Sequence, residues 1–184
     1  MAEPRDRYST VSLFLHWTTA ALVVTQLILI SLVENGDSDM RGFWMTGHKS
    51  VGLTILVLTL ARLAWRIANP AIPLPERTPG WQKLAARGTH VLFYVLLLAM
   101  PLAGWAASSA AGRTVQFFGL FPWPDLPMPA DRGLAKDIME AHETAGMLLI
   151  ALVVLHILGG LKHYIVDRDG VLNRMLPFLP RRAA

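Results

Sequence analysis

Four separate runs of apolar residues, each about long enough to cross a bilayer, constrain this chain more than any other feature. A transmembrane helix needs roughly 20 mostly apolar residues, and a chain in lipid must satisfy its own backbone hydrogen bonds. The sequence therefore predicts an all-α, transmembrane four-helix bundle. It is predicted to be one membrane domain, residues 1–184, with helices at about 11–33, 43–67, 89–111 and 141–165.

Composition supports a membrane protein. The chain is 53% hydrophobic with a mean hydropathy of +0.41, which is unusual for a water-soluble domain. The second run is the weakest because it contains Lys49 and Arg62, whose long side chains can reach the headgroups. The first run resembles a signal peptide, but its length and the following SLVENG, which offers no small-residue cleavage site, favour a retained helix. The absence of cysteine excludes disulfides and covalently attached haem.

Basic residues are distributed unevenly among the connections, eleven against five. By the positive-inside bias, the richer side is cytoplasmic. This predicts a multi-pass membrane protein with both termini in the cytoplasm. The richer side carries Arg5, Arg7, Arg66, Arg77, Lys83, Arg87, Lys162, Arg168, Arg174, Arg181 and Arg182, and the other carries Arg41, Lys49, Arg113, Arg132 and Lys136.

The sequence pI near 9.9 is then explained by topology and by anionic membrane lipid. A nucleic-acid partner would require a basic face with aromatic platforms on a soluble domain, and the sequence shows neither. Lipid is therefore a predicted partner and nucleic acid is not.

Four histidines lie at matched depths in the apolar runs. His142 and His156 are 14 residues apart on the last helix, which corresponds to about 21 Å. Because successive helices run in opposite directions, His48 shares the outer level with His142. His16 shares the inner level with His156. Polar side chains at such depths tend to mark functional sites.

Two facing imidazoles are the axial ligands that a six-coordinate b-type haem requires. The sequence therefore predicts two haem b groups, an outer one held by His48 and His142 and an inner one held by His16 and His156. Hydrogen bonding of each histidine to a neighbouring helix is the alternative. A metal transporter is a further alternative, although such sites usually include carboxylates or thioethers, and no Asp or Glu lies inside any span.

Glycines follow three of these histidines by four residues, which places each glycine on its histidine's helix face. Gly52 follows His48 and Gly146 follows His142. Both are predicted to leave room for the cofactor. Ordinary helix packing, in which small residues are common, is the alternative.

Three basic residues in or beside the second run are candidates for the site. Arg62 follows His48 by 14 residues and so stands near the inner level, where it is predicted to pair with a haem propionate or to stabilise a semiquinone. Arg41 and Lys49 stand near the outer level, where they are predicted to attract a small anion or to bind propionates. Ordinary interfacial charge is the alternative for all three.

Two connections also carry predictions. Residues 68–82 contain four prolines and are predicted to form an extended cytoplasmic strap. Residues 108–140 form an outer loop in which FFGLFPWPDLPMP is predicted to lie in the interface, followed by a short polar helix, DRGLAKDIMEA.

Taken in order, several segments resemble the bacterial cytochrome b561 family: SLFLHW, TGHKSVG, LTLARLAWR, AHETAG, LHILGGLKHY and DGVLNRMLP. The resemblance implies a four-helix inner-membrane cytochrome with two b haems. Carried over by motif, it implies the ligands His16, His48, His142 and His156. It further implies electron transfer, with superoxide oxidation on the periplasmic side and ubiquinone reduction as the best-characterised activity. Other members are quinol-linked or serve periplasmic electron carriers.

Two more histidines need roles. His163 lies two turns beyond His156, and it is predicted to contact a quinone headgroup and donate protons, since histidine titrates near neutrality. Related sequences often carry two adjacent histidines where this one has Lys162-His163-Tyr164, and an interfacial histidine is the alternative. His90, at the start of the third helix, is a candidate contact for haem or quinone.

The predicted function is thus a membrane oxidoreductase that takes electrons from superoxide and passes them to ubiquinone. The alternative is a quinol-linked conduit that docks a periplasmic cytochrome or reductase. Short outer loops of mixed charge favour the small substrate.

Overall fold

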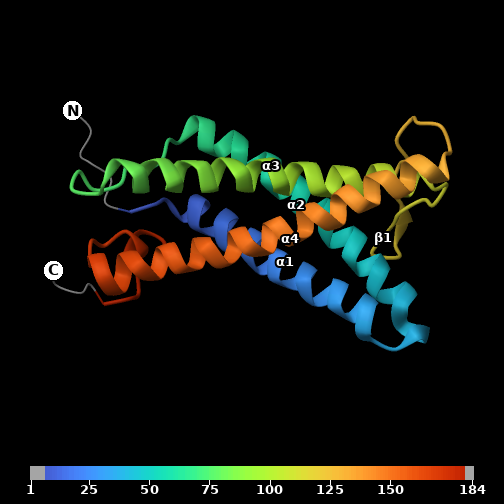
Figure 1. Cartoon of the computed structure of the whole chain (residues 1–184), viewed down its shortest axis with the longest axis horizontal. Helices are drawn as coiled ribbons and strands as arrows, with labels where there is room; N and C mark the ends of the chain where they lie inside the picture. Colours follow the sequence, from blue (N-terminus) through green and yellow to red (C-terminus); the bar gives the residue numbers. More distant parts are fainter. Residues whose placement is uncertain (1–6, 181–184) are drawn as a thin grey trace.

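The computed structural model describes residues 7–180, so Arg5, Arg181 and Arg182 lie outside the described residues. Four long helices make up most of it (Figure 1). All four, with short flanking turns, are long and apolar enough to cross a membrane, which confirms the predicted all-α membrane bundle. The helices are α1 (Thr10–Asn35), α2 (Arg41–Ala68), α3 (Gly80–Ala110) and α4 (Arg132–Lys162).

Two helices begin earlier than the apolar runs indicate, α3 at Gly80 instead of about 89 and α4 at Arg132 instead of about 141. Asp131 caps α4, because its Oδ1 accepts hydrogen bonds from the main-chain N–H groups of Gly133 and Leu134 at 2.8 and 3.1 Å. The segment predicted as a separate short helix is therefore the first part of α4. A capping residue sets where a helix begins, whereas an apolar run shows only where it enters lipid.

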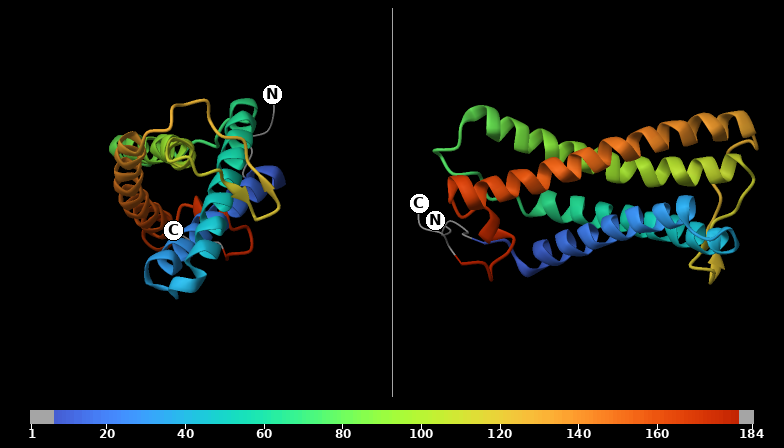
Figure 2. Two further views of the ribbon diagram at one scale, coloured as in Figure 1. Left: turned by 90° about the vertical axis from the view of Figure 1, so that its right-hand side faces the viewer. Right: turned by 60° about the horizontal axis from the view of Figure 1, so that its bottom comes forward.

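The helices pack in chain order: α1 on α2, α2 on α3, and α3 on α4. Figure 2 shows the α1–α2 pair and the α3–α4 pair as two layers along a common long axis. Over residues 7–180, α4 has no comparably close backbone packing with α1 or α2. The predicted histidine pairs join these more widely separated helices.

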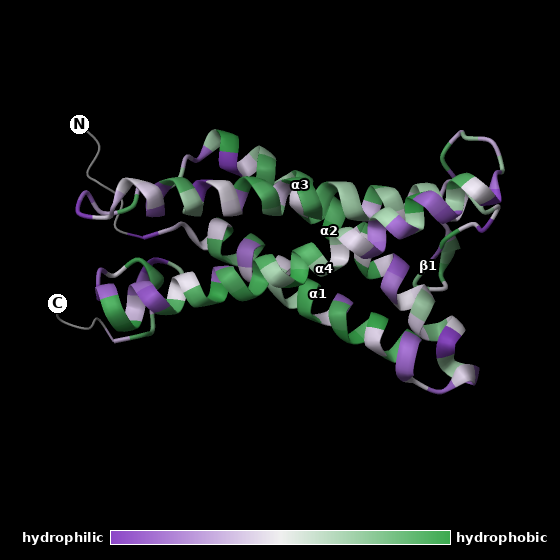
Figure 3. Cartoon of the chain, viewed as in Figure 1, coloured by the Kyte–Doolittle hydropathy of each residue, from purple (hydrophilic) through white to green (hydrophobic). Residues whose placement is uncertain are grey.

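The densest apolar core lies midway along the bundle. It consists of Val51 and Ile55 from α2, Leu96 and Leu97 from α3, and Leu149 and Leu152 from α4. Many other large apolar side chains point outward, among them Met147, 67% exposed, and Leu155, 61% exposed. Figure 3 shows apolar colouring along the middle of the helices and polar colouring toward their ends. Such an outward apolar band fits a lipid environment.

The connection between α3 and α4 folds onto one end of the bundle. It contains a short antiparallel hairpin, β1 (Gln116–Phe117) and β2 (Phe121–Pro122). Ser50 of α2 is fully buried beneath it, and its Oγ accepts a hydrogen bond from the main-chain N–H of Phe118 at 2.7 Å. The aromatic loop is thereby anchored beside His48.

The opposite end of the bundle holds the start of α1, residues 69–79 and the C-terminal segment (Figure 1). There α4 continues into a π-helical turn, η2 (His163–Asp167), and a 3-10 turn, η3 (Leu172–Arg174), follows. Trp17 donates from Nε1 to the main-chain carbonyl of Met175 at 3.0 Å, and Arg174 donates to that of Pro73 at 2.7 Å. These bonds close this end of the bundle.

Candidate functional site

The inner pair of predicted ligands meets across the bundle. His16 of α1 and His156 of α4 face one another with ring centres 6.2 Å apart. Both are half-buried between helices whose backbones are not closely packed.

The outer pair has almost the same spacing. His48 of α2 and His142 of α4 have ring centres 6.3 Å apart. Nδ1 of His142 lies 3.0 Å from the main-chain carbonyl of Met100 on α3. Since a carbonyl only accepts, Nδ1 carries the proton of a neutral ring and Nε2 is the nitrogen left to bind a metal.

The distances test whether the pairs fit a six-coordinate haem. Two imidazoles on opposite sides of one metal ion, each nitrogen about 2 Å from it, place their ring centres about 6 Å apart. Both observed separations, 6.2 and 6.3 Å, agree with that value. Neutral imidazoles from opposing helices are also the donors that b-type haem takes. The residues present fit the group at both levels.

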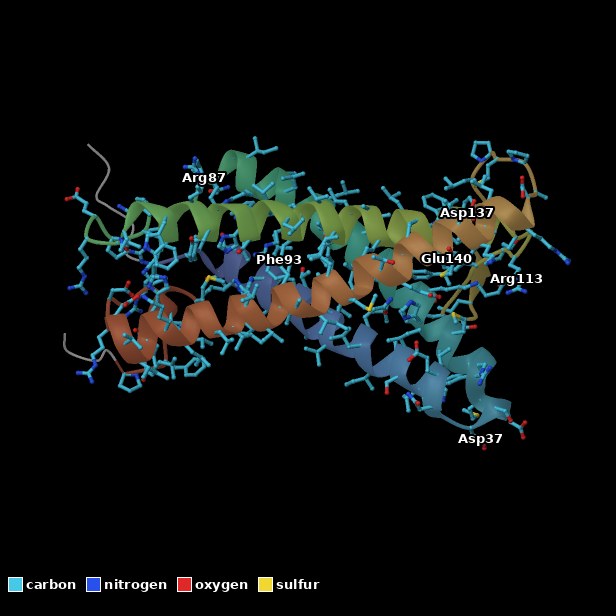
Figure 4. The ribbon with its side chains drawn as sticks, viewed as in Figure 1. Asp37, Arg87, Phe93, Arg113, Asp137 and Glu140 are labelled. Atoms are coloured by element: carbon cyan, nitrogen blue, oxygen red, sulfur yellow. The ribbon has the colours of Figure 1, made fainter. Side chains whose placement is uncertain are left out.

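Other rings surround the inner pair. His90 and Phe93 of α3 lie 5.5 and 5.3 Å from the ring of His156, both edge to face. Figure 4 shows Phe93 between α3 and α4. Trp17 packs against His16 at 5.1 Å. The structure thus brings His90, a candidate left open by the sequence, to the inner level.

Arg62 also joins the inner pair. Its Nη2 lies 2.9 Å from Nδ1 of His16, and its guanidinium carbon lies 5.8 Å from the ring centre of Tyr94. A guanidinium only donates, so here Nδ1 of His16 is the acceptor. A neutral histidine that binds iron through Nε2 carries its proton on Nδ1. The Arg62 hydrogen bond and an iron bond at Nε2 therefore require different tautomers of His16.

The predicted glycines have side-chain neighbours. A Cβ added to Gly52 would lie 3.3 Å from Nε2 of Gln26, and one added to Gly146 would lie 3.6 Å from the methyl carbon of Met100. Gly104, which sequence reasoning missed, is closer to a ligand: its added Cβ would lie 3.4 Å from Cε1 of His142. A small residue in α3 at the outer histidine's depth is the signal that could have found it.

His163 stands apart from the inner pair, in a polar cluster. Its Nδ1 lies 2.7 Å from Asp169 and 3.4 Å from Asp167, and the side chain of Asp169 is only 3% exposed. Lys162 binds Asp167 at 2.6 Å. The spacing of His163 and the two aspartates would also suit a metal ion, but the Lys162 ammonium already neutralises Asp167, so the cluster is an ion-pair network. Sequence reasoning missed both aspartates.

The predicted outer cations lie toward the hairpin end. Lys49 is half-buried next to His48. Arg113 lies near enough to Lys49 for the two charges to interact. Arg41 is exposed in the first turn of α2. Figure 4 shows Arg113 at the same end as Asp137 and Glu140, so positive and negative groups are mixed there.

Comparisons with known proteins agree with the family resemblance found in the sequence. Residues 7–178 match the family model described as prokaryotic cytochrome b561. The chain is 33% identical to cytochrome b561 homolog 2 of Escherichia coli (strain K12), covering 93% of this chain and 92% of that one. It is 29% identical to cytochrome b561 homolog 1 of the same organism, covering 94% and 98%. It is also 29% identical to the probable superoxide oxidase CybB of Yersinia pestis, covering 93% and 96%.

Proposed function

Because the chain belongs to the prokaryotic cytochrome b561 family, whose members bind haem b and transfer electrons within a membrane, we propose that it is a di-haem b oxidoreductase of the bacterial inner membrane. It moves electrons between the periplasmic side and the quinone pool, taking them from superoxide and passing them to ubiquinone. The observation that supports this best is the pair of histidine separations, 6.2 and 6.3 Å, at two levels of one bundle.

Each histidine pair has a defined task in this proposal. His16 and His156 would hold the inner haem, and His48 and His142 would hold the outer one. When bound, the haems supply one-electron transfer between the two sides of the membrane. Met100 fixes the tautomer of His142 through its carbonyl. Arg62 would leave Nδ1 of His16 and pair with a haem propionate, the anion that its charge requires.

The outer end suits a small anionic donor. Lys49 and Arg113 supply positive charge beside His48, and a cationic approach raises the local concentration of an anion such as superoxide. Each superoxide ion gives up one electron and leaves as dioxygen. Two such oxidations and two protons convert one ubiquinone to ubiquinol, so the net reaction balances.

The inner end suits proton delivery. His163 follows His156 by seven residues on the same helix and holds a hydrogen bond to the buried carboxylate of Asp169. A carboxylate that accepts from one ring nitrogen orients the ring and leaves the other nitrogen to face a second group. His163 would therefore hold a proton for a quinone bound near the inner level, with both termini on this cytoplasmic side.

A docking function for a periplasmic electron carrier is the second candidate, and the hairpin favours it. Phe118, Leu120 and Phe121 are 50%, 78% and 47% exposed at the outer end. An apolar, aromatic surface of this kind is a feature of protein interfaces. Insertion into the membrane interface would use the same residues.

Stopped-flow mixing with superoxide tests the proposal. The oxidised protein in detergent is expected to show the spectrum of reduced haem b within the dead time or milliseconds after mixing. Added ubiquinone is expected to return it to the oxidised spectrum, because the quinone removes the electrons. Loss of superoxide that leaves the haem spectrum oxidised throughout, with and without quinone, would contradict the superoxide assignment and leave the docking function.

His163→Ala separates electron entry from electron exit in the same assay. Reduction by superoxide is expected to keep its rate, whereas reoxidation by ubiquinone is expected to slow by roughly 10²-fold, the usual contribution of a positioned proton donor. Lys136→Gln is the matched control, since Lys136 is 76% exposed in a surface pair with Glu140 at the other end. Equal slowing of both steps in His163→Ala would contradict the proton-donor role.

A further inference from the structure

Gln26 lies where α1 crosses α2, at the level of the outer histidine pair. Its Nε2 donates a hydrogen bond to the main-chain carbonyl of His48 at 2.9 Å. Gly52 provides the space for this amide, because a Cβ there would lie 3.3 Å from Nε2. The His48 carbonyl can only accept a hydrogen bond, so the nitrogen of the Gln26 amide must face it. Oε1 of Gln26 therefore points away from that carbonyl.

Two buried polar atoms at this crossing have no hydrogen-bond partner in the described structure: Oε1 of Gln26 and Nδ1 of His48. The main-chain carbonyl of Gln26 also lies near enough to the His48 ring to interact with it. An unpaired buried polar atom destabilises the folded state, so such atoms are uncommon in proteins. Here one is an acceptor and the other becomes a donor when Nδ1 carries the proton.

His142, the other histidine of the outer pair, makes a hydrogen bond through Nδ1 that His48 lacks. Nδ1 of His142 is paired with the carbonyl of Met100 at 3.0 Å, whereas Nδ1 of His48 is unpaired. Metal-bound histidines almost always donate their second N–H to an oxygen, which orients the ring and raises its basicity. The unpaired side-chain acceptor at this crossing is Oε1 of Gln26, whose amide is already bonded to the main chain of His48.

We propose that Gln26 is the positioning residue of His48. Its Nε2 holds the main chain of α2 at His48, and its Oε1 accepts the hydrogen bond from Nδ1–H when Nε2 binds haem iron. The proposal rests on the proposed function, which places a haem between His48 and His142. A more basic ligand favours the ferric state, so this bond lowers the reduction potential of the outer haem.

An ordinary interhelical hydrogen bond is the competing explanation, because polar side chains commonly join membrane helices. The two explanations differ in what they change. A bond that only holds α1 to α2 affects the stability of the whole bundle and therefore both haems. A bond to the ligand's Nδ1 changes the electronic properties of one haem, and it does so in a direction set by the strength of the acceptor.

Redox titration of Gln26→Met and Gln26→Glu in the haem-loaded protein tests the proposal. Both side chains are close in size to glutamine, and pyridine haemochrome assays give the haem content of each. The outer haem is expected to titrate at a higher potential in Gln26→Met, which has no acceptor, and at a lower potential in Gln26→Glu, which has a stronger one. The inner haem is expected to be unchanged. His142→Ala identifies the outer wave as the one that it removes.

Thr25→Val is the matched control, because Thr25 is the preceding residue on α1, exposed, and bonded only to the carbonyl of Ala21. It is expected to leave both waves unchanged. Loss of the outer haem alone from Gln26→Met also supports the proposal, since a loosened outer ligand is the cause. Unchanged waves, or waves that move together in both variants, overturn it. Absence of haem from the unmodified protein would instead contradict the proposed function.

Discussion

The His142→Ala variant is expected to bind one haem per chain, and the unmodified protein is expected to bind two. His142 and His48 are the only pair of facing histidine rings at the outer level of the described residues, 6.3 Å apart. Alanine removes one ligand of the proposed outer haem, together with its hydrogen bond to the Met100 carbonyl. The pyridine haemochrome assay measures the ratio of haem to protein, and the inner haem is expected to remain.

Glu143→Gln is the control for this variant, since Glu143 is the next residue on α4 and is exposed. It is expected to retain both haems. If His142→Ala also retained both, imidazoles from α2 and α4 would not be the outer ligands, and the pairing inferred from depth and spacing would be wrong.

Arg62→Met is expected to weaken retention of the inner haem by roughly 10–100-fold, the usual effect of losing a group that supports a bound metal. Within residues 7–180 no carboxylate lies within ion-pair distance of Arg62, although its side chain is half-buried against His16. A buried cation needs an anion, and a haem propionate would provide it.

Transfer of haem to a soluble haem-binding acceptor measures this retention. Arg62→Lys is expected to lose haem at an intermediate rate, because lysine keeps the charge but not the forked donor geometry. Arg66→Met is the control one turn along the same helix. If Arg62→Met retained haem as well as the unmodified protein does, Arg62 would not support the haem and would only reach the lipid headgroups.

Sequence reasoning found the membrane helices and predicted which histidines face one another, because both depend on depth along a helix. A rise of about 1.5 Å per residue places residues at levels without reference to neighbouring helices. His16 and His156 could be paired this way although 140 residues separate them in the chain. The helix starts were less predictable, because Pro79 and Asp131 act outside the apolar runs.

Contacts between helices could not be predicted in the same way. Spacing by four residues places Gly52 on the face of His48, but the rotation of α1 about its axis decides that Gln26 fills the space beside it. Gly104 and Asp169 were missed for the same reason: each becomes significant only through a neighbour from another segment. The roles of Arg41 and Lys49 remain predictions.

The packing order of the helices has a consequence for biosynthesis. Within residues 7–180, α4 packs far more closely on α3 than on α1 or α2, so its ties to α1 and α2 run through the core and through the two histidine levels. A ligand that binds only the assembled form stabilises it by mass action. The newly inserted chain is therefore expected to close fully only as iron porphyrin becomes available, so cellular porphyrin supply would set how much of the protein escapes proteolytic quality control.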